Sequence, residues 1–132
     1  MNGKITRKNP DSMPKPVGNY THMTRVPKEA DLFVTSGQIG VDMDGHIPSN
    51  FNDQVKNTFI NIKKVLDSEE LNEEHIIKVN IWATEEIDWD YLYAKWEELF
   101  GNDYPAMTIA YISQLGLPDL KIEIELWCAK VE

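Results

Sequence analysis

The chain has one cysteine, no long hydrophobic run and few basic residues relative to acidic ones. A single thiol, Cys128, cannot close an intramolecular disulfide and does not supply the cysteine cluster of a structural zinc site. The longest apolar runs are a few residues, whereas a membrane-spanning helix needs about 20. Residues 1–18 also lack the apolar centre of a signal peptide. These absences predict a cytoplasmic protein with no membrane partner.

Acidic side chains outnumber basic ones by 22 to 13, which gives a formal net charge of −9. Residues 1–28 hold six of the basic side chains and a single acid, Asp11, so the rest of the chain carries a charge near −14. Binding to nucleic acid depends on Lys and Arg displacing counterions from phosphates. We therefore expect no nucleic-acid partner, and a ribonuclease-type activity is the least favoured function.

The length of 132 residues is typical of one domain, and we expect residues 1–132 to form a single domain. A core of this size gains stability when the protein buries more surface against copies of itself. Residues 1–17 contain several prolines and show no hydrophobic periodicity. This pattern predicts an irregular N-terminal arm.

Apolar residues at helical spacing predict two helices. The first is preceded by Asn50 and Asn52, either of which can cap it, and one of its faces carries Val55, Phe59, Ile62 and Leu66. The second helix is predicted to begin near Asp88, which is a good N-cap, and to end at Gly101.

Strand-forming residues occupy most of the remaining chain. Strands are predicted at residues 20–26, 32–39, 76–83, 106–113 and 120–129, with a further short strand after a turn at residues 42–45. The first two are expected to form a hairpin. In strand 76–83, strict alternation places Ile76 and Trp82 on one face and Ile77, Val79 and Ile81 on the other. The predicted element order is βββαβαββ.

Strands interrupted by two amphipathic helices predict an α+β fold, a two-layer sandwich of one mixed sheet with both helices on one face. In the strand that contains Met107, Ile109 and Tyr111, the opposite face carries Ala106 and Ala110. Neither face suits water, yet two helices can cover only one. We expect other subunits of a closed homo-oligomer to cover the second face. The alternative is a slightly apolar, exposed sheet.

Few side chains have the spacing of a known chemical motif. The histidines, His22, His46 and His75, lack metal-ligand spacing, so no metal site is expected. Glu123 and Glu125 alternate with apolar residues and project from the sheet face opposite that apolar row. On a buried face, a carboxylate must find a donor or take up a proton, and such a group is a candidate general acid or base. The alternative is an ordinary half-exposed strand.

Four segments together resemble the RidA (YjgF) family: G-N-Y-T-H at residues 18–22, L-F-V-T-S-G-Q-I at 32–39, Y-P-A at 104–106 and K-I-E-I-E at 121–125. The resemblance extends from about residue 17 to the end of the chain. It implies a chorismate-mutase-like fold, a homotrimer with clefts between neighbouring subunits, and no cofactor.

Members of the best-known type of this family hydrolyse 2-imino and enamine acids to 2-keto acids and ammonia. By matching motifs, Tyr20 would line the cleft, Ser36 and Gly37 would offer backbone N–H groups, and Glu123 would position water as the catalytic residue. The family's P-A-R arginine, which pairs with the substrate carboxylate, is replaced by Met107. Tyr93 stands where many members have a cleft asparagine.

A thioether cannot replace a bidentate, permanently charged guanidinium. We therefore expect a RidA-like trimer that binds a small metabolite in inter-subunit clefts or hydrolyses a ligand without a carboxylate. The alternative is a conventional imine deaminase in which another cation, such as Arg25 or a neighbouring subunit's lysine, replaces the arginine. A purely structural or regulatory role is a further alternative.

Overall fold

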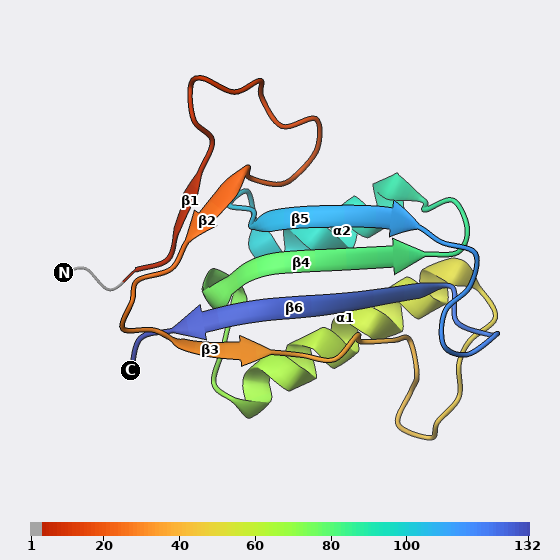
Figure 1. Cartoon of the computed structure of the whole chain (residues 1–132). Coiled ribbons are helices and arrows are strands. Elements are labelled where there is room, and N and C mark those ends of the chain that lie inside the picture. The colour runs from red at the N-terminus through yellow and green to blue at the C-terminus, as the bar shows by residue number, and fades with distance from the viewer. Residues whose placement is uncertain (1–3) are drawn as a thin grey trace.

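The computed structural model describes residues 4–132 and contains a four-stranded sheet with two helices on one face (Figure 1). The sheet order is β3-β6-β4-β5, with bounds Asp31–Val34 for β3, Ile76–Ala83 for β4, Ala106–Tyr111 for β5 and Ile122–Lys130 for β6. The β4–β5 pair is parallel, and the β4–β6 and β3–β6 pairs are antiparallel. The predicted mixed sheet and α+β fold are confirmed.

Both helices begin at side chains that accept a hydrogen bond from a backbone N–H in the first turn. Asn50 caps α1 (Phe51–Ser68), and Asp88 caps α2 (Trp89–Phe100). Gly101 ends α2 with a φ of 68°, a conformation that glycine adopts without steric cost. The predicted helices are confirmed, and neither is long and apolar enough to cross a membrane.

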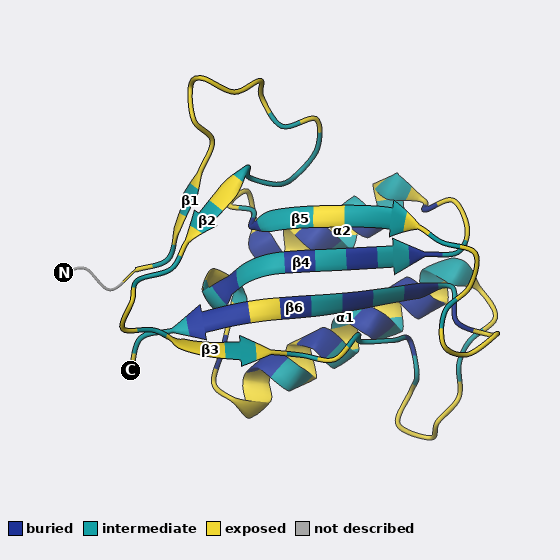
Figure 2. Ribbon diagram, viewed as in Figure 1, coloured by how far each residue is buried: buried dark blue, intermediate teal, exposed yellow. Residues whose placement is uncertain are grey.

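The core lies between the helices and the side of the sheet that faces them (Figure 2). Cys128 belongs to it, and burial raises the pKa of this thiol to about 11, so the thiol stays protonated and unreactive at neutral pH. The largest fully buried apolar side chains are Val55, Ile62, Ile76, Val79, Ile81, Leu92, Trp96, Ile122, Ile124 and Leu126.

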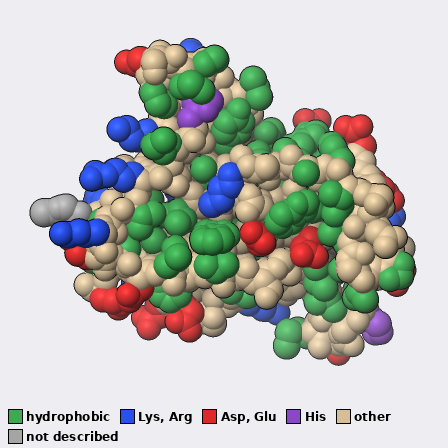
Figure 3. Space-filling model, in the orientation of Figure 1, with side chains coloured by type: hydrophobic (Ala, Val, Ile, Leu, Met, Phe, Trp, Pro, Cys, Tyr) green, Lys and Arg blue, Asp and Glu red, His purple; other side chains and the backbone are tan. Residues whose placement is uncertain are grey.

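The opposite face of the sheet is turned toward the viewer in Figure 1, and Figure 3 shows hydrophobic side chains gathered over it. Leu32, Val34 and Trp127 lie on this face and are 57%, 54% and 38% exposed. We call it the open face. A contiguous apolar patch in contact with water is typical of a surface that another molecule covers.

The N-terminal arm includes a strand that the sequence pattern did not predict. β1 (Thr6–Lys8) pairs with β2 (Met23–Arg25) in a separate antiparallel ribbon. The predicted hairpin between residues 20–26 and 32–39 is therefore wrong, because β2 pairs with β1 and β3 pairs with β6. In segments this short, an extended pattern does not specify the partner strand.

The strand predicted after residues 42–45 is also wrong. The turn itself forms, with Gly45 at a φ of 86° and its N–H donating to the carbonyl of Asp42 at 3.0 Å. The chain then enters α1 without a strand, and β3 is followed only by an isolated bridge between Gln38 and Ile124. Three strands still precede α1, as the predicted order has it, because β1 takes the place of the strand that does not form.

A bulge in β4 changes which side chains face the core. The register on β6 shifts after Ile76 and leaves Ile77 without a partner there, so Ile76 is buried with Val79 and Ile81. The expectation from strict alternation, which placed Ile76 on the same face as Trp82, is wrong.

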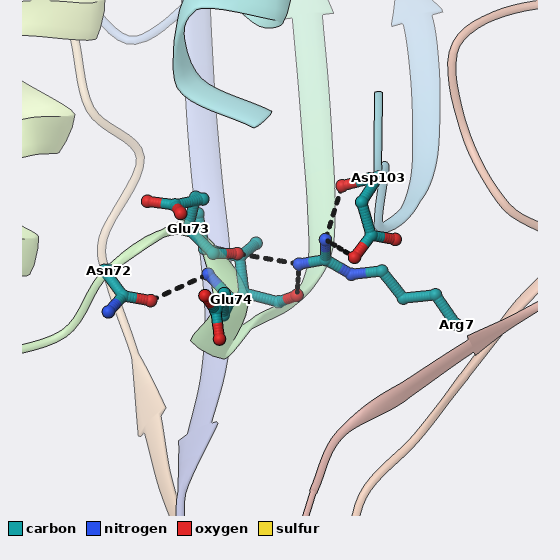
Figure 4. Close-up of polar contacts among 6 residues, drawn as sticks. Arg7, Asn72, Glu73, Glu74 and Asp103 are labelled. Atoms are coloured by element: carbon teal, nitrogen blue, oxygen red, sulfur yellow. Dashed lines mark hydrogen bonds and ion pairs between the residues drawn. The ribbon is translucent and has the colours of Figure 1, made fainter. Parts of the chain in front are cut away.

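Arg7 fastens β1 to the body of the protein (Figure 4). Its side chain is 6% exposed and donates hydrogen bonds to the carbonyl oxygens of Asp103, Glu73 (2.7 Å) and Ile76 (2.9 Å). The guanidinium also pairs with the carboxylate of Asp103 at 3.6 Å and lies 5.7 Å from the ring centre of Phe100. Burial lowers the pKa of Arg7, and Asp103 opposes that shift.

Replacing Arg7 with Met should lower the free energy of unfolding by about 2 kcal/mol, because partly buried carbonyl groups lose a charged donor. Urea unfolding at a fixed protein concentration measures the effect. Lys8→Met, on the exposed side of the same strand, is the matched control and should leave the midpoint unchanged. Equal midpoints for the two variants would show that Arg7 does not fasten the arm.

Candidate functional site

The residues singled out from the sequence form two groups at opposite edges of the sheet. Ser36 and Gly37 follow edge strand β3 and lie beside Glu123 of β6. Tyr20 and Met107 lie at the other edge, which β5 forms. We call these groups the β3-side half and the β5-side half.

In the β3-side half, backbone hydrogen bonds hold residues 35–38 against β6. The Thr35 N–H donates to the carbonyl of Leu126 at 3.0 Å, and Gln38 and Ile124 exchange N–H to carbonyl bonds of 2.7 and 3.0 Å. Between these anchors, the N–H groups of Ser36 and Gly37 make no hydrogen bond within residues 4–132. They remain available to an oxygen acceptor.

Glu123 lies directly against Gly37. A Cβ on Gly37 would overlap Oε2 of Glu123 and lie 2.5 Å from Cγ and Cδ, so only glycine leaves room for this carboxylate. Glu123 is also opposite Trp82 of β4, which places it on the open face. Glu123 and the S-G-Q segment therefore lie side by side within one chain.

A groove of about 250 Å³ extends from Ser36 along the helix-covered side of the β3 edge. Sequence reasoning missed this groove, since it forms between β3 and the end of α1, which are distant in sequence. Its apolar lining comes from Phe33, Val34, Val65, Leu66, Leu71 and Cys128.

In the β5-side half, α2 holds the segment that carries Tyr20. The Tyr93 hydroxyl accepts a hydrogen bond from the Asn19 N–H at 3.3 Å, and a Cβ on Gly18 would lie 2.5 Å from that hydroxyl. The indole N–H of Trp96 donates to the carbonyl of Asn19 at 2.8 Å. Tyr93 therefore anchors the loop before Tyr20, a contact that sequence spacing does not reveal.

Met107 is half-buried and packs against the core from edge strand β5. Its partner on β4 is Val79, so Met107 faces the helices, whereas Glu123 faces the other side. Two strand spacings, roughly 10 Å, also separate β5 from β6. A single chain thus does not bring Met107 and Glu123 into one pocket.

The β5-side half contains aromatic and acidic groups. Burial raises the pKa of Tyr104, and the charges of Glu97 and Tyr93 raise it further. Asn19 donates to Glu97 at 3.4 Å. The buried Thr21 hydroxyl oxygen has no hydrogen-bond partner within residues 4–132. The Thr21 N–H donates to the carbonyl of Pro105, the residue before β5, at 3.1 Å.

Within residues 4–132, one cluster has the spacing of metal ligands: Asp42, Asp44 and His46, all exposed. The Asp42 carboxylate already accepts the N–H groups of Asp44 and His46 at 2.9 Å each. Hydrogen bonds within its own turn therefore account for this cluster.

The two halves coincide with the segments that carry the resemblance noted above, and residues 10–130 match the family model described as endoribonuclease L-PSP. The chain belongs to this family, the RidA (YjgF) family. A RutC family protein from Aquifex aeolicus is 32% identical over 120 residues, which cover 89% of the chain and 93% of that relative.

Two further RidA relatives extend the comparison. The 2-iminobutanoate/2-iminopropanoate deaminase of Escherichia coli is 25% identical over 119 residues, 87% of the chain and 90% of that protein. YyfB from Yersinia pestis, a Rid-family protein of unknown function, superposes with a TM-score of 0.83 at 18% identity over 95% and 98% of the two chains. The latter likeness shows the shared fold.

Gly37→Ala should destabilise the protein by about 1–3 kcal/mol, because the new methyl group overlaps the Glu123 side chain. Gly116→Ala is the control, since a Cβ there meets nothing within 4 Å. In a Glu123→Ala background, Gly37→Ala should cost much less. A cost that is the same in both backgrounds, measured by chemical denaturation, would show that the two residues do not interact.

Proposed function

We propose that this RidA-family protein is a homotrimer that binds a small ligand without a carboxylate in clefts between neighbouring subunits. The observation that carries the proposal is the separation of the two halves at opposite edges of one sheet. A closed ring of copies can place the β5 edge of one subunit beside the β3 edge of the next. Burial of the apolar open face favours the same assembly.

Within residues 4–132, no basic side chain pairs with Glu123, and this lack of a positive partner determines the ligand class. A carboxylate bound to the N–H groups of Ser36 and Gly37 would lie close to Glu123. Two like charges 4 Å apart repel by about 1 kcal/mol in water and by about 4 kcal/mol at an effective dielectric constant of 20. A backbone hydrogen bond contributes only about 0.5–1.5 kcal/mol. Without a guanidinium at Met107, a carboxylate is therefore bound weakly.

The second candidate function is hydrolysis of 2-imino acids, the activity in the name of the Escherichia coli relative. The Glu123 carboxylate, which makes no hydrogen bond or ion pair within residues 4–132, favours this function because it is free to hold a water molecule. A cation would have to replace the arginine. Arg25 is exposed on β2 and is available for that role.

Light scattering at micromolar concentration should give a molar mass about three times the 15.2 kDa of the chain. Val34→Asp puts a charge on the open face and should shift the protein to monomers. Ile60→Asp, on the outer surface of α1 and 44% exposed, should leave the trimer intact. A monomeric wild type would contradict the proposal.

Met107→Arg should increase the rate of keto-acid release from an imino acid by about one to two orders of magnitude, because a charge-assisted bidentate pair contributes about 1.5–3 kcal/mol. An amino-acid oxidase can generate the imino acid in the assay. Ala94→Arg, exposed on α2, controls for added charge. Rapid hydrolysis by the unmodified protein would instead establish the conventional deaminase.

A further inference from the structure

We propose that the ligand of this site is a cation, a primary amine or a protonated imine attached to an apolar group, and that its positive charge pairs with Glu123. The inference rests on the proposed inter-subunit site and specifies what that site recognises. It differs from recognition of an imino acid, in which the carboxylate needs a positive protein group.

Glu123 differs from its neighbour on the same face of β6. The Glu125 carboxylate accepts hydrogen bonds from Asn80 at 3.0 Å and from the indole N–H of Trp127 at 3.3 Å. Glu123 is also half-buried, but within residues 4–132 it has neither a hydrogen bond nor an ion pair, and its carboxylate lies against the bare backbone of Gly37. The Glu125 carboxylate therefore has hydrogen-bond partners within the described chain, whereas the Glu123 carboxylate has none.

Assembly would withdraw Glu123 further from water, and a buried carboxylate without a partner is unfavourable. Among the residues of strands β3 to β6, Lys78 is the basic side chain on the open face, and its ammonium donates to the Thr108 hydroxyl at 2.7 Å, toward the β5 edge and away from β3. A cationic group on the ligand would give Glu123 the partner that the described chain does not supply.

The apolar part of the ligand is assigned to the β3-side groove. Glu69 is the single charged residue among those that line it, and it is exposed, so a charge pair there would be weakened by water. The groove ends at Ser36 on the helix-covered side, while the Glu123 carboxylate lies against Gly37 on the open face, so the ammonium of a ligand held in the groove would reach Glu123 around this edge of the sheet.

The β5-side half contains basic groups as well: Lys15 lines a hollow with Tyr20, and the Lys78 ammonium donates to Thr108 of β5. Tyr20 and Tyr93 provide aromatic rings, which attract cations, and Glu97 adds a further negative charge near Tyr104. The aromatic rings and Glu97 can accept a positive ligand group in the β5-side half, and Glu123 carries the charge preference of the site.

Three probes of nearly equal size separate the charge states: 2-phenylethylamine, which is positive at neutral pH, 2-phenylethanol and phenylacetate. Calorimetry and ligand-observed NMR on the full-length protein should show the amine binding at least about tenfold more tightly than the alcohol, with phenylacetate weakest. Glu123→Gln should reduce the amine's affinity to that of the alcohol. Glu125→Gln and Glu69→Gln should retain most of the preference.

Light scattering on the same samples distinguishes the two levels of the proposal. A trimer that binds phenylacetate as tightly as the amine, or whose amine preference survives Glu123→Gln, overturns the cation assignment and leaves the inter-subunit site standing. A monomer that binds none of the probes overturns the proposed function itself, and this inference with it. Met107→Arg should reverse the preference toward phenylacetate and serves as a positive control for anion binding.

Discussion

The sheet has apolar side chains on both faces, but its own chain supplies helices for only one. The helix-covered face is closed by side chains such as Leu92 and Trp96 of α2, which are almost fully buried. Across the sheet, Leu32 and Val34 lie half-exposed beside Trp127. In the homotrimer proposed above, copies of the chain cover the open face, and the same contact determines which sheet edges meet.

The same constraint explains why the candidate site is divided. A pocket built within one subunit would need its residues on one face, but Met107 faces the helices while Glu123 projects into the open face. A site at the joint between two sheet edges has no such requirement. Such an inter-subunit site can combine Met107, from the helix side of the β5 edge, with the Glu123 carboxylate, which lies against Gly37 at the β3 edge.

Local signals in the sequence were sufficient for the helices and for the position of Glu123. Caps and apolar spacing act within a few residues, and alternation along β6 correctly placed Glu123 opposite the Ile122 row. Pairing could not be predicted in the same way: β2 joins β1 rather than β3, and Arg7 bonds residues about 70 positions away. The bulge at Ile77 likewise has no local signal.

The loop that carries Tyr20 is bonded both to Tyr93 and to Pro105, which lies two positions before Met107. The Tyr93 hydroxyl reaches the backbone of Asn19 and fits against Gly18, a contact that a shorter asparagine would not make in the same way. In the same loop, the Thr21 N–H donates a hydrogen bond to the carbonyl of Pro105. By the family resemblance, Met107 stands in place of an arginine and Tyr93 in place of an asparagine, and both residues lie in the β5-side half. In the proposed inter-subunit site, these two replacements would exchange charged or amide recognition for aromatic and apolar surface and leave Glu123 as an unpaired negative charge facing the ligand.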